Sequence, residues 1–99
     1  MHFQILHIED CPNWEEAGRR LRLALDDSGH EDAAVEFRSL HTPAEAAAVE
    51  FAGSPTFTVD GADIFPADRI ADLACRVYRT PNGLAGLPTV EQLTGALRA

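Results

Sequence analysis

The feature that most constrains the fold is a short, almost uninterrupted apolar run at residues 3–8 that is followed at once by a helical pattern. The run suits a strand buried on both faces of a sheet. Apolar residues then recur at helical spacing over residues 12–28, with Pro12 suited to the first helical position. A buried strand followed by an amphipathic helix predicts a parallel crossover unit. Cys11 lies at the junction between the two elements.

The rest of the chain continues this alternation. Thr42 is suited to the N-cap of a second, alanine-rich helix, and Asp60-Gly61 is typical of a tight hairpin turn. The expected elements after the first helix are a strand at 35–40, a helix at 42–51, strands at 56–59 and 62–65, and a helix at 90–98. The order β-α-β-α-β-β-α predicts an α/β fold with a four-stranded mixed sheet in a single domain, residues 1–99.

Residues 66–88 form an insertion that is too long for a simple connection. Its apolar residues fit one face of a helix, whereas Cys75, Val77 and Arg79 fit one side of an extended strand. Both interpretations remain open from the sequence. Because the antiparallel fourth strand runs back toward the Cys11 end of the sheet, we expect the insertion to emerge beside Cys11.

Charge and cysteine content exclude several function classes. Sixteen acidic residues and eight arginines give a net charge of −8, with a balance of −7 in the first fifty residues. An acidic surface repels nucleic-acid phosphates and anionic lipid, so we expect neither partner. No basic and apolar leader and no apolar run of membrane-spanning length is visible, which predicts a cytoplasmic protein. In the reducing cytoplasm, two cysteines are more typical of free, catalytic or redox-sensing thiols than of a structural disulfide.

Cys11 is the leading candidate for chemistry. The first amides of a helix lack backbone partners and carry the positive end of the helix dipole, which favours a thiolate. Its polar flanks predict an exposed side chain. Nearby carboxylates oppose ionisation, so we expect modest activation unless an arginine such as Arg76 or Arg79 folds over the thiol. Cys75 in the insertion fits either a packing residue or a second redox thiol.

Two short motifs carry a resemblance to a known family. Cys11-Pro12-x-Trp14 follows the first strand, and Ser54-Pro55-Thr56 leads into the third. With the element order, these motifs resemble the thioredoxin-like superfamily, in particular small bacterial members that lack the Cys-x-x-Cys pair. The resemblance implies a cis Ser54–Pro55 bond that faces Cys11 and presents a substrate backbone to it. Trp14 occupies the position of the second cysteine.

The leading hypothesis is thiol–disulfide exchange with Cys11 as nucleophile, resolved by Cys75 or by an external thiol. The expected partners are a protein or a low-molecular-weight thiol or disulfide, with no cofactor. Candidate substrate-binding residues are Trp14, Ser54, Pro55, Thr56 and Arg76.

Two other interpretations remain. The first is a non-enzymatic thioredoxin-like module that binds a partner protein or a soft metal ion, and the second is an adaptor with an incidental thiol. The chain shows no ligand spacing typical of a structural zinc site. Two thiolates brought together would still suit a soft ion such as Hg(II) or Cu(I).

Overall fold

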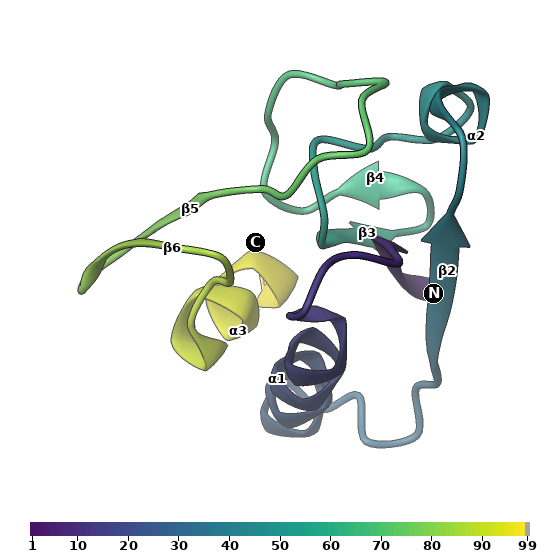
Figure 1. The fold of residues 1–99 in the computed structure, drawn as a ribbon. Coiled ribbons are helices and arrows are strands. Elements are labelled where there is room, and N and C mark those ends of the chain that lie inside the picture. The colour runs from purple at the N-terminus through teal and green to yellow at the C-terminus, as the bar shows by residue number, and fades with distance from the viewer. Residues whose placement is uncertain (99) are drawn as a thin grey trace.

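The computed structural model describes residues 1–98 and shows a mixed sheet with helices on both faces (Figure 1). In chain order the elements are β1 (Phe3–Ile8), α1 (Trp14–Asp27), β2 (Val35–Leu40), α2 (Pro43–Ala47), β3 (Thr56–Val59), β4 (Ala62–Asp63), β5 (Tyr78–Thr80), β6 (Gly83–Ala85) and α3 (Val90–Arg98). None of the helices within residues 1–98 combines the length and apolar character needed to cross a bilayer.

Four strands form the main sheet in the order β2-β1-β3-β4. β1 pairs with β2 in parallel and with β3 in antiparallel fashion, and β3 pairs with β4 in antiparallel fashion. The predicted four-stranded mixed sheet is therefore confirmed. The turn between β3 and β4 is also as predicted, because Asp60 and Gly61 both have positive φ, at 52° and 87°.

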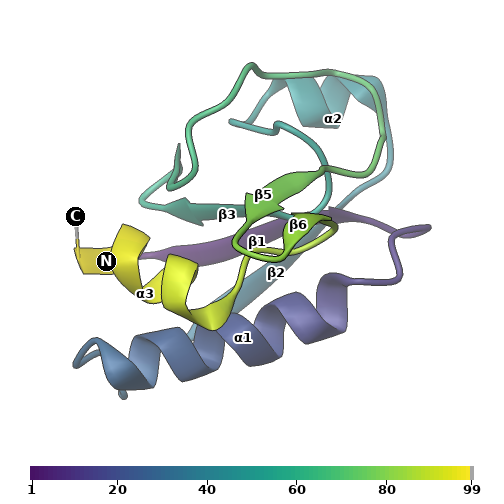
Figure 2. The ribbon, with the colours of Figure 1, turned by 90° about the vertical axis from the view of Figure 1, so that its left-hand side faces the viewer.

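The apolar residues of β1 alternate between two cores, one on each face of the sheet. Figure 2 shows α1 and α3 on one side of the sheet and α2 on the other. Phe3 and Ile5 pack in the cluster that contains residues of α1 and α3, and Leu6 and Ile8 pack in the cluster that contains Ala46 of α2. This double burial explains why the run at residues 3–8 is almost wholly apolar. The second core also contains Cys11.

α1 begins two residues later than the sequence predicts. Asn13 is the N-cap and Ala17 makes the first helical hydrogen bond, to the carbonyl of Asn13 at 2.9 Å. The amide of Cys11 instead donates to the carbonyl of Ile8 at 3.3 Å, which closes a turn before the helix. Pro12 is thus a turn residue, and the turn carries Cys11 into the second core.

Two further predicted elements are shorter in the structure. Thr42 caps α2 through a reciprocal capping box with Glu45, as its sequence position predicts, but the helix ends at Ala47 rather than near residue 51. β4 ends at Asp63 rather than at residue 65, because the Asp63 carboxylate accepts the amide of Phe65 at 2.9 Å and the chain turns away from the sheet.

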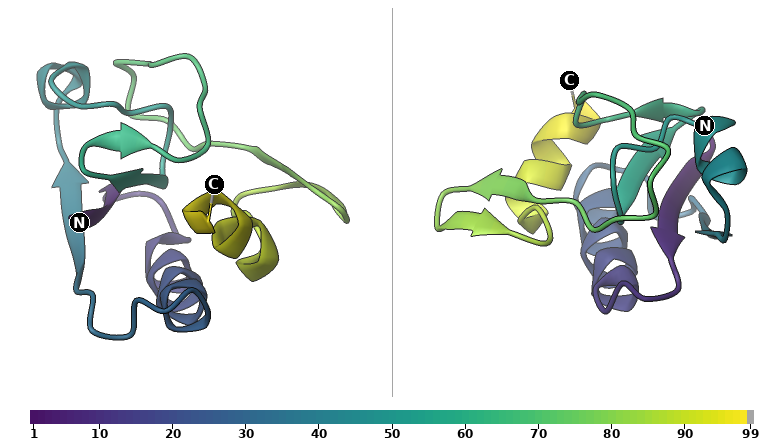
Figure 3. Two further views of the ribbon diagram at one scale, coloured as in Figure 1. Left: turned by 180° about the vertical axis from the view of Figure 1, so that it is seen from behind. Right: turned by 45° about the horizontal axis from the view of Figure 1, so that its top comes forward.

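The insertion is neither the continuous helix nor the continuous strand that its pattern allows. Residues 66–77, which we name the strap, cross the second core without regular structure, and β5 and β6 then form a separate hairpin. The hairpin projects beyond the main sheet and α3 (Figure 3). Two apolar residues of the strap, Ile70 and Leu73, pack on the second core and hold the strap against the body.

Arg76 fixes the junction between the strap and the hairpin. Its guanidinium forms a buried ion pair with Asp63 at 2.9 Å, donates to the carbonyl of Phe65 and lies 4.5 Å from the centre of the Tyr78 ring. Burial raises the pKa of the Asp63 carboxyl and outweighs the opposing effects of the Phe65 amide and of Arg76. Arg76 therefore connects the strap to the end of β4.

Replacing Arg76 with alanine is expected to lower the free energy of unfolding by about 3–5 kcal/mol, because it leaves the buried Asp63 carboxylate without its partner. Urea denaturation measures this loss. Arg79→Ala, at an exposed position of the same hairpin, is the control and should change stability by less than about 0.5 kcal/mol. Equal losses in the two variants would contradict the tethering role of Arg76.

Candidate functional site

Cys11 lies in the second core near the carboxyl end of β1. Its side chain is 1% exposed, and its Sγ donates a weak hydrogen bond to the carbonyl of Ser54 at 3.8 Å. The prediction of an exposed Cys11 is therefore wrong. The polar residues before it remain at the surface, but the turn over residues 8–13 directs the thiol inward, where the strap covers the apolar cluster that surrounds it.

The Ser54–Pro55 bond is cis, as the resemblance implies. The loop is fixed to β1 because the buried Ser54 Oγ accepts the amide of Ile8 at 3.0 Å. Thr56 Oγ1 donates to the carbonyl of Gly53, and the Tyr78 hydroxyl donates to the carbonyl of Pro55. The structure thus brings Ser54, Pro55 and Cys11 together, as the sequence predicts, whereas Thr56 stabilises the loop from within.

The strap pairs with this loop through its backbone. The amide of Ser54 donates to the carbonyl of Ala74, and the amide of Arg76 donates to the carbonyl of Ser54, both at 2.9 Å. These two bonds form a parallel bridge between Ser54 and Cys75. Ser54 therefore holds both cysteines, since its carbonyl accepts Cys11 Sγ and its backbone pairs on either side of Cys75.

Gly53 makes the close approach of the strap possible. Its φ is +113°, and a Cβ at this position would lie 2.7 Å from Arg76 Cβ and 2.9 Å from Arg76 Cα. Any side chain at residue 53 would thus meet the backbone of the strap, in a conformation that residues with a Cβ rarely adopt.

Cys75 is the exposed member of the pair, and both cysteines are free thiols. Partial burial raises the pKa of the Cys75 thiol from its ordinary value of 9.0, and the charge of Cys11, a hydrogen bond with it and the charge of Asp10 raise it further. Cys75 and Cys11 are both neighbours of Ser54, at the end of the sheet where the topology predicts that the insertion emerges. The neighbouring groups favour the protonated form of Cys75.

The arginines of the strap point away from the thiols. Arg76 binds Asp63, and Arg69 donates to the carbonyls of Ala47 and Val49. Arg76, named from the sequence as a substrate-binding candidate and as an arginine that could fold over Cys11, instead has the buried Asp63 carboxylate as its partner.

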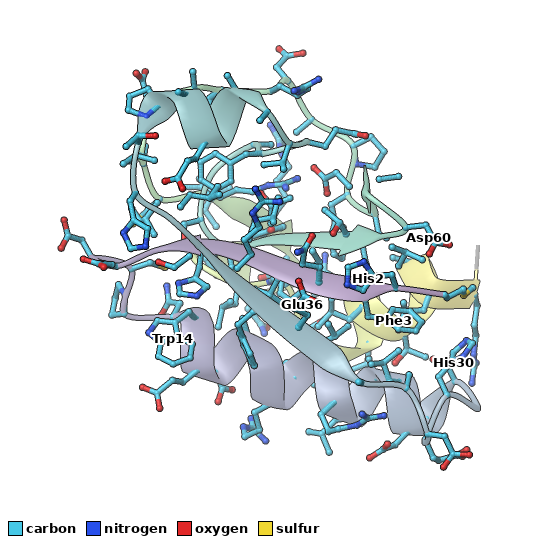
Figure 4. The ribbon with its side chains drawn as sticks, turned by 90° about the vertical axis from the view of Figure 1, so that its right-hand side faces the viewer. His2, Phe3, Trp14, His30, Glu36 and Asp60 are labelled. Carbon is cyan, nitrogen blue, oxygen red and sulfur yellow. The ribbon has the colours of Figure 1, made fainter. Side chains whose placement is uncertain are left out.

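Trp14 stands at the start of α1 (Figure 4). Its ring stacks on His7 with centroids 5.0 Å apart and meets Phe37 edge-on at 5.5 Å. These partners belong to β1 and β2, so Trp14, a substrate-binding candidate from the sequence, has one ring face covered by His7 and packs away from the Pro55 loop. His7 is a buried residue of β1 whose Nδ1 lies 3.3 Å from the carbonyl of Ile8.

Three residues of this site were not among the sequence candidates: Gly53, Asp63 and Tyr78. Gly53 directly precedes Ser54-Pro55, and a glycine at that position is a signal for a close backbone approach. No local sequence pattern marks Asp63 or Tyr78 as part of the site, because their contacts depend on where the strap docks. Within residues 1–98, no three or more His, Cys, Asp or Glu side chains gather where they could hold a metal ion.

Gly53→Ala is expected to destabilise the protein by at least about 2 kcal/mol, from backbone strain plus the clash with Arg76. Gly29→Ala is the matched control, since its φ is +83° and a Cβ there meets nothing within 4 Å. Urea denaturation gives both values, and hydrogen exchange at the Arg76 amide reports strap docking directly. If the two variants lose equal stability and that amide stays protected, the strap does not depend on Gly53.

Alkylation of Cys75 by iodoacetamide is expected to accelerate with pH beyond pH 9, because only the thiolate reacts and the pKa is raised. Cys11→Ser removes one of the groups that raise this pKa, so the rate profile should move toward lower pH. Rates measured by mass spectrometry of the Cys75 peptide test this shift. Superimposable profiles would show that the thiols do not interact.

The comparisons with known proteins give no family or relative for this chain, so a function has to be inferred from the geometry of the site. No protein-family model matches the chain, and neither a curated protein nor a solved structure matches it.

Proposed function

We propose that the protein is a thioredoxin-like thiol protein that exchanges disulfides through a reversible Cys11–Cys75 pair. The observation that carries the proposal is the backbone pairing of Ser54 with residues 74–76, because Ser54 also accepts the Cys11 thiol and therefore has a buried and an exposed cysteine as neighbours. The proposed partner is a low-molecular-weight disulfide or an exposed protein disulfide. The proposed setting is the cytoplasm, where thiols are kept reduced.

The exchange balances with no cofactor. A thiolate of the pair attacks one sulfur of the partner disulfide, which forms a mixed disulfide and releases the first partner thiolate. The second thiol loses its proton and attacks the cysteine sulfur of the mixed disulfide, which releases the second partner thiolate. The protein thus loses two electrons and two protons, and the partner leaves as two thiols.

The thioredoxin-like assignment is supported by three features in combination. They are the strand order β2-β1-β3-β4, the cysteine between β1 and α1, and the cis Ser54–Pro55 bond in contact with that cysteine. Because position 14 is tryptophan, the second thiol of this pair comes from the strap, far along the sequence.

A soft-metal function is the second candidate, and the same pair of thiols favours it. Two thiolates suit Cu(I) or Hg(II), and no third ligand is needed for a two-coordinate site. The two functions differ in a simple way, since metal capture needs both thiols reduced whereas exchange oxidises them.

Incubation of the reduced protein with hydroxyethyl disulfide is expected to yield a monomer two hydrogens lighter, with a Cys11–Cys75 link found by peptide mapping. In the chain-entropy account, closing this loop stabilises the oxidised form by about 4 kcal/mol, so it should melt at a higher temperature. The Cys11→Ser and Cys75→Ser variants are the controls, and neither should form the internal link.

Formation of intermolecular dimers only, or of stable adducts that never resolve, would contradict exchange through this pair. Tight binding of one Cu(I) per reduced monomer, measured by competition with a chromogenic chelator, would then favour the metal function.

A further inference from the structure

We infer that Cys75, rather than Cys11, is the thiol that attacks the incoming disulfide, and that its surroundings select disulfides bearing a cationic amine. This inference rests on the proposed exchange function and adds to it the order of the two steps and the class of substrate.

Access decides the order. Attack on a disulfide requires the thiolate to approach along the S–S axis, so the sulfur must be reachable from solvent. Cys11 is 1% exposed and lies under the strap, with Sγ directed at the carbonyl of Ser54. Cys75 is exposed and needs no movement of the strap to meet a partner. The cysteine nearest the helix therefore resolves the mixed disulfide, and the cysteine of the strap forms it.

The docked strap also prepares the second step. Once Cys75 carries the mixed disulfide, Cys11 is already close by, because the carbonyl of Ser54 accepts the Cys11 thiol and the backbone of Ser54 pairs on either side of Cys75. The backbone bonds on either side of Cys75 keep it there. Cys11 attacks Cys75 Sγ, its proton passes to solvent, and the partner thiolate leaves outward.

A pocket beside this end of the strap indicates the class of partner. It has a volume of about 170 Å³ and is lined by Ile8, Glu9, Asp10, Leu40, His41 and Leu73. Its apolar floor and acidic rim suit a short carbon chain that ends in a cation. Leu73, two residues before Cys75, lines the same pocket as Asp10, and the charge of Asp10 is the smallest of the contributions that raise the pKa of Cys75.

Of the two carboxylates that line this pocket near Cys75, Asp10 is the one whose side chain is not engaged by another residue of the described chain. His41 Nδ1 lies 3.1 Å from Glu9 Oε1, so these two side chains bind each other. Asp10 has no hydrogen-bond or ion-pair partner within residues 1–98. The strap adds the exposed Asp72, while its arginines are bound elsewhere. An anionic disulfide is therefore repelled, and a cationic one is attracted.

The order is tested by trapping. Cys11→Ser should accumulate a persistent mixed disulfide at Cys75 with hydroxyethyl disulfide, whereas Cys75→Ser should form its adduct at Cys11 at least about tenfold more slowly. Brief reaction of the unmodified protein followed by acid quench and peptide mapping gives the same answer without a substitution. Faster modification of Cys11 would overturn the order, even if the internal disulfide still forms.

Substrate class is tested with three disulfides of similar size: cystamine, hydroxyethyl disulfide and dithiodiglycolate. Rates with Cys11→Ser at low salt should fall in that order, and the spread should shrink as salt is added. Asp10→Asn should reduce the ratio of cystamine to dithiodiglycolate rates about threefold, because one charge near the thiol is removed. Asp32→Asn, an exposed carboxylate beyond the opposite end of β1 and β2, is the matched control and should leave the ratio unchanged.

Equal rates for the three reagents, or an effect of Asp32→Asn equal to that of Asp10→Asn, would overturn the charge selection. These outcomes are distinct from failure of the proposed function, in which none of the three reagents would convert the unmodified protein to the internal disulfide.

Discussion

The arrangement of the site depends on the backbone pairing between Ser54 and residues 74–76. Two hydrogen bonds of 2.9 Å hold the strap to the loop that precedes β3, and the carbonyl of Ser54 also accepts the Cys11 thiol. The absence of a side chain at Gly53 lets the strap approach this closely. One short loop thus binds the thiol of Cys11 and fixes the position of Cys75.

The strap needs support along its length because it has no regular structure of its own. Ile70 and Leu73 bury apolar area on the second core, and the amide of Ile70 donates to the carbonyl of Phe51 at 2.9 Å. Arg76 then ties its end to Asp63 in a buried ion pair. The cost of removing the two charges from water offsets much of their Coulombic attraction. The main effect of the pair is therefore to specify where the strap ends.

Much of the fold follows from local patterns in the sequence. The bounds of β1, β2, β3 and α3 agree with the apolar periodicity, and the Asp60-Gly61 turn and the Thr42 cap follow from side-chain chemistry. The errors occur where long-range contacts override local preference. Pro12 suits the first turn of a helix, yet it lies in the turn closed by the Cys11–Ile8 hydrogen bond, before α1 begins. β4 ends early because the Asp63 side chain accepts the amide of Phe65.

The sequence by itself determined the order of the elements, the mixed sheet and the place of Cys11 and Pro55 at one end of it, because strand and helix periodicities are local properties. Only the tertiary structure decided which thiol faces solvent. That outcome depends on the docking of the strap some sixty residues away, and on a partner for Arg76 that no local pattern reveals. Burial of Cys11 is therefore a property of the assembled loops rather than of its own flanking residues.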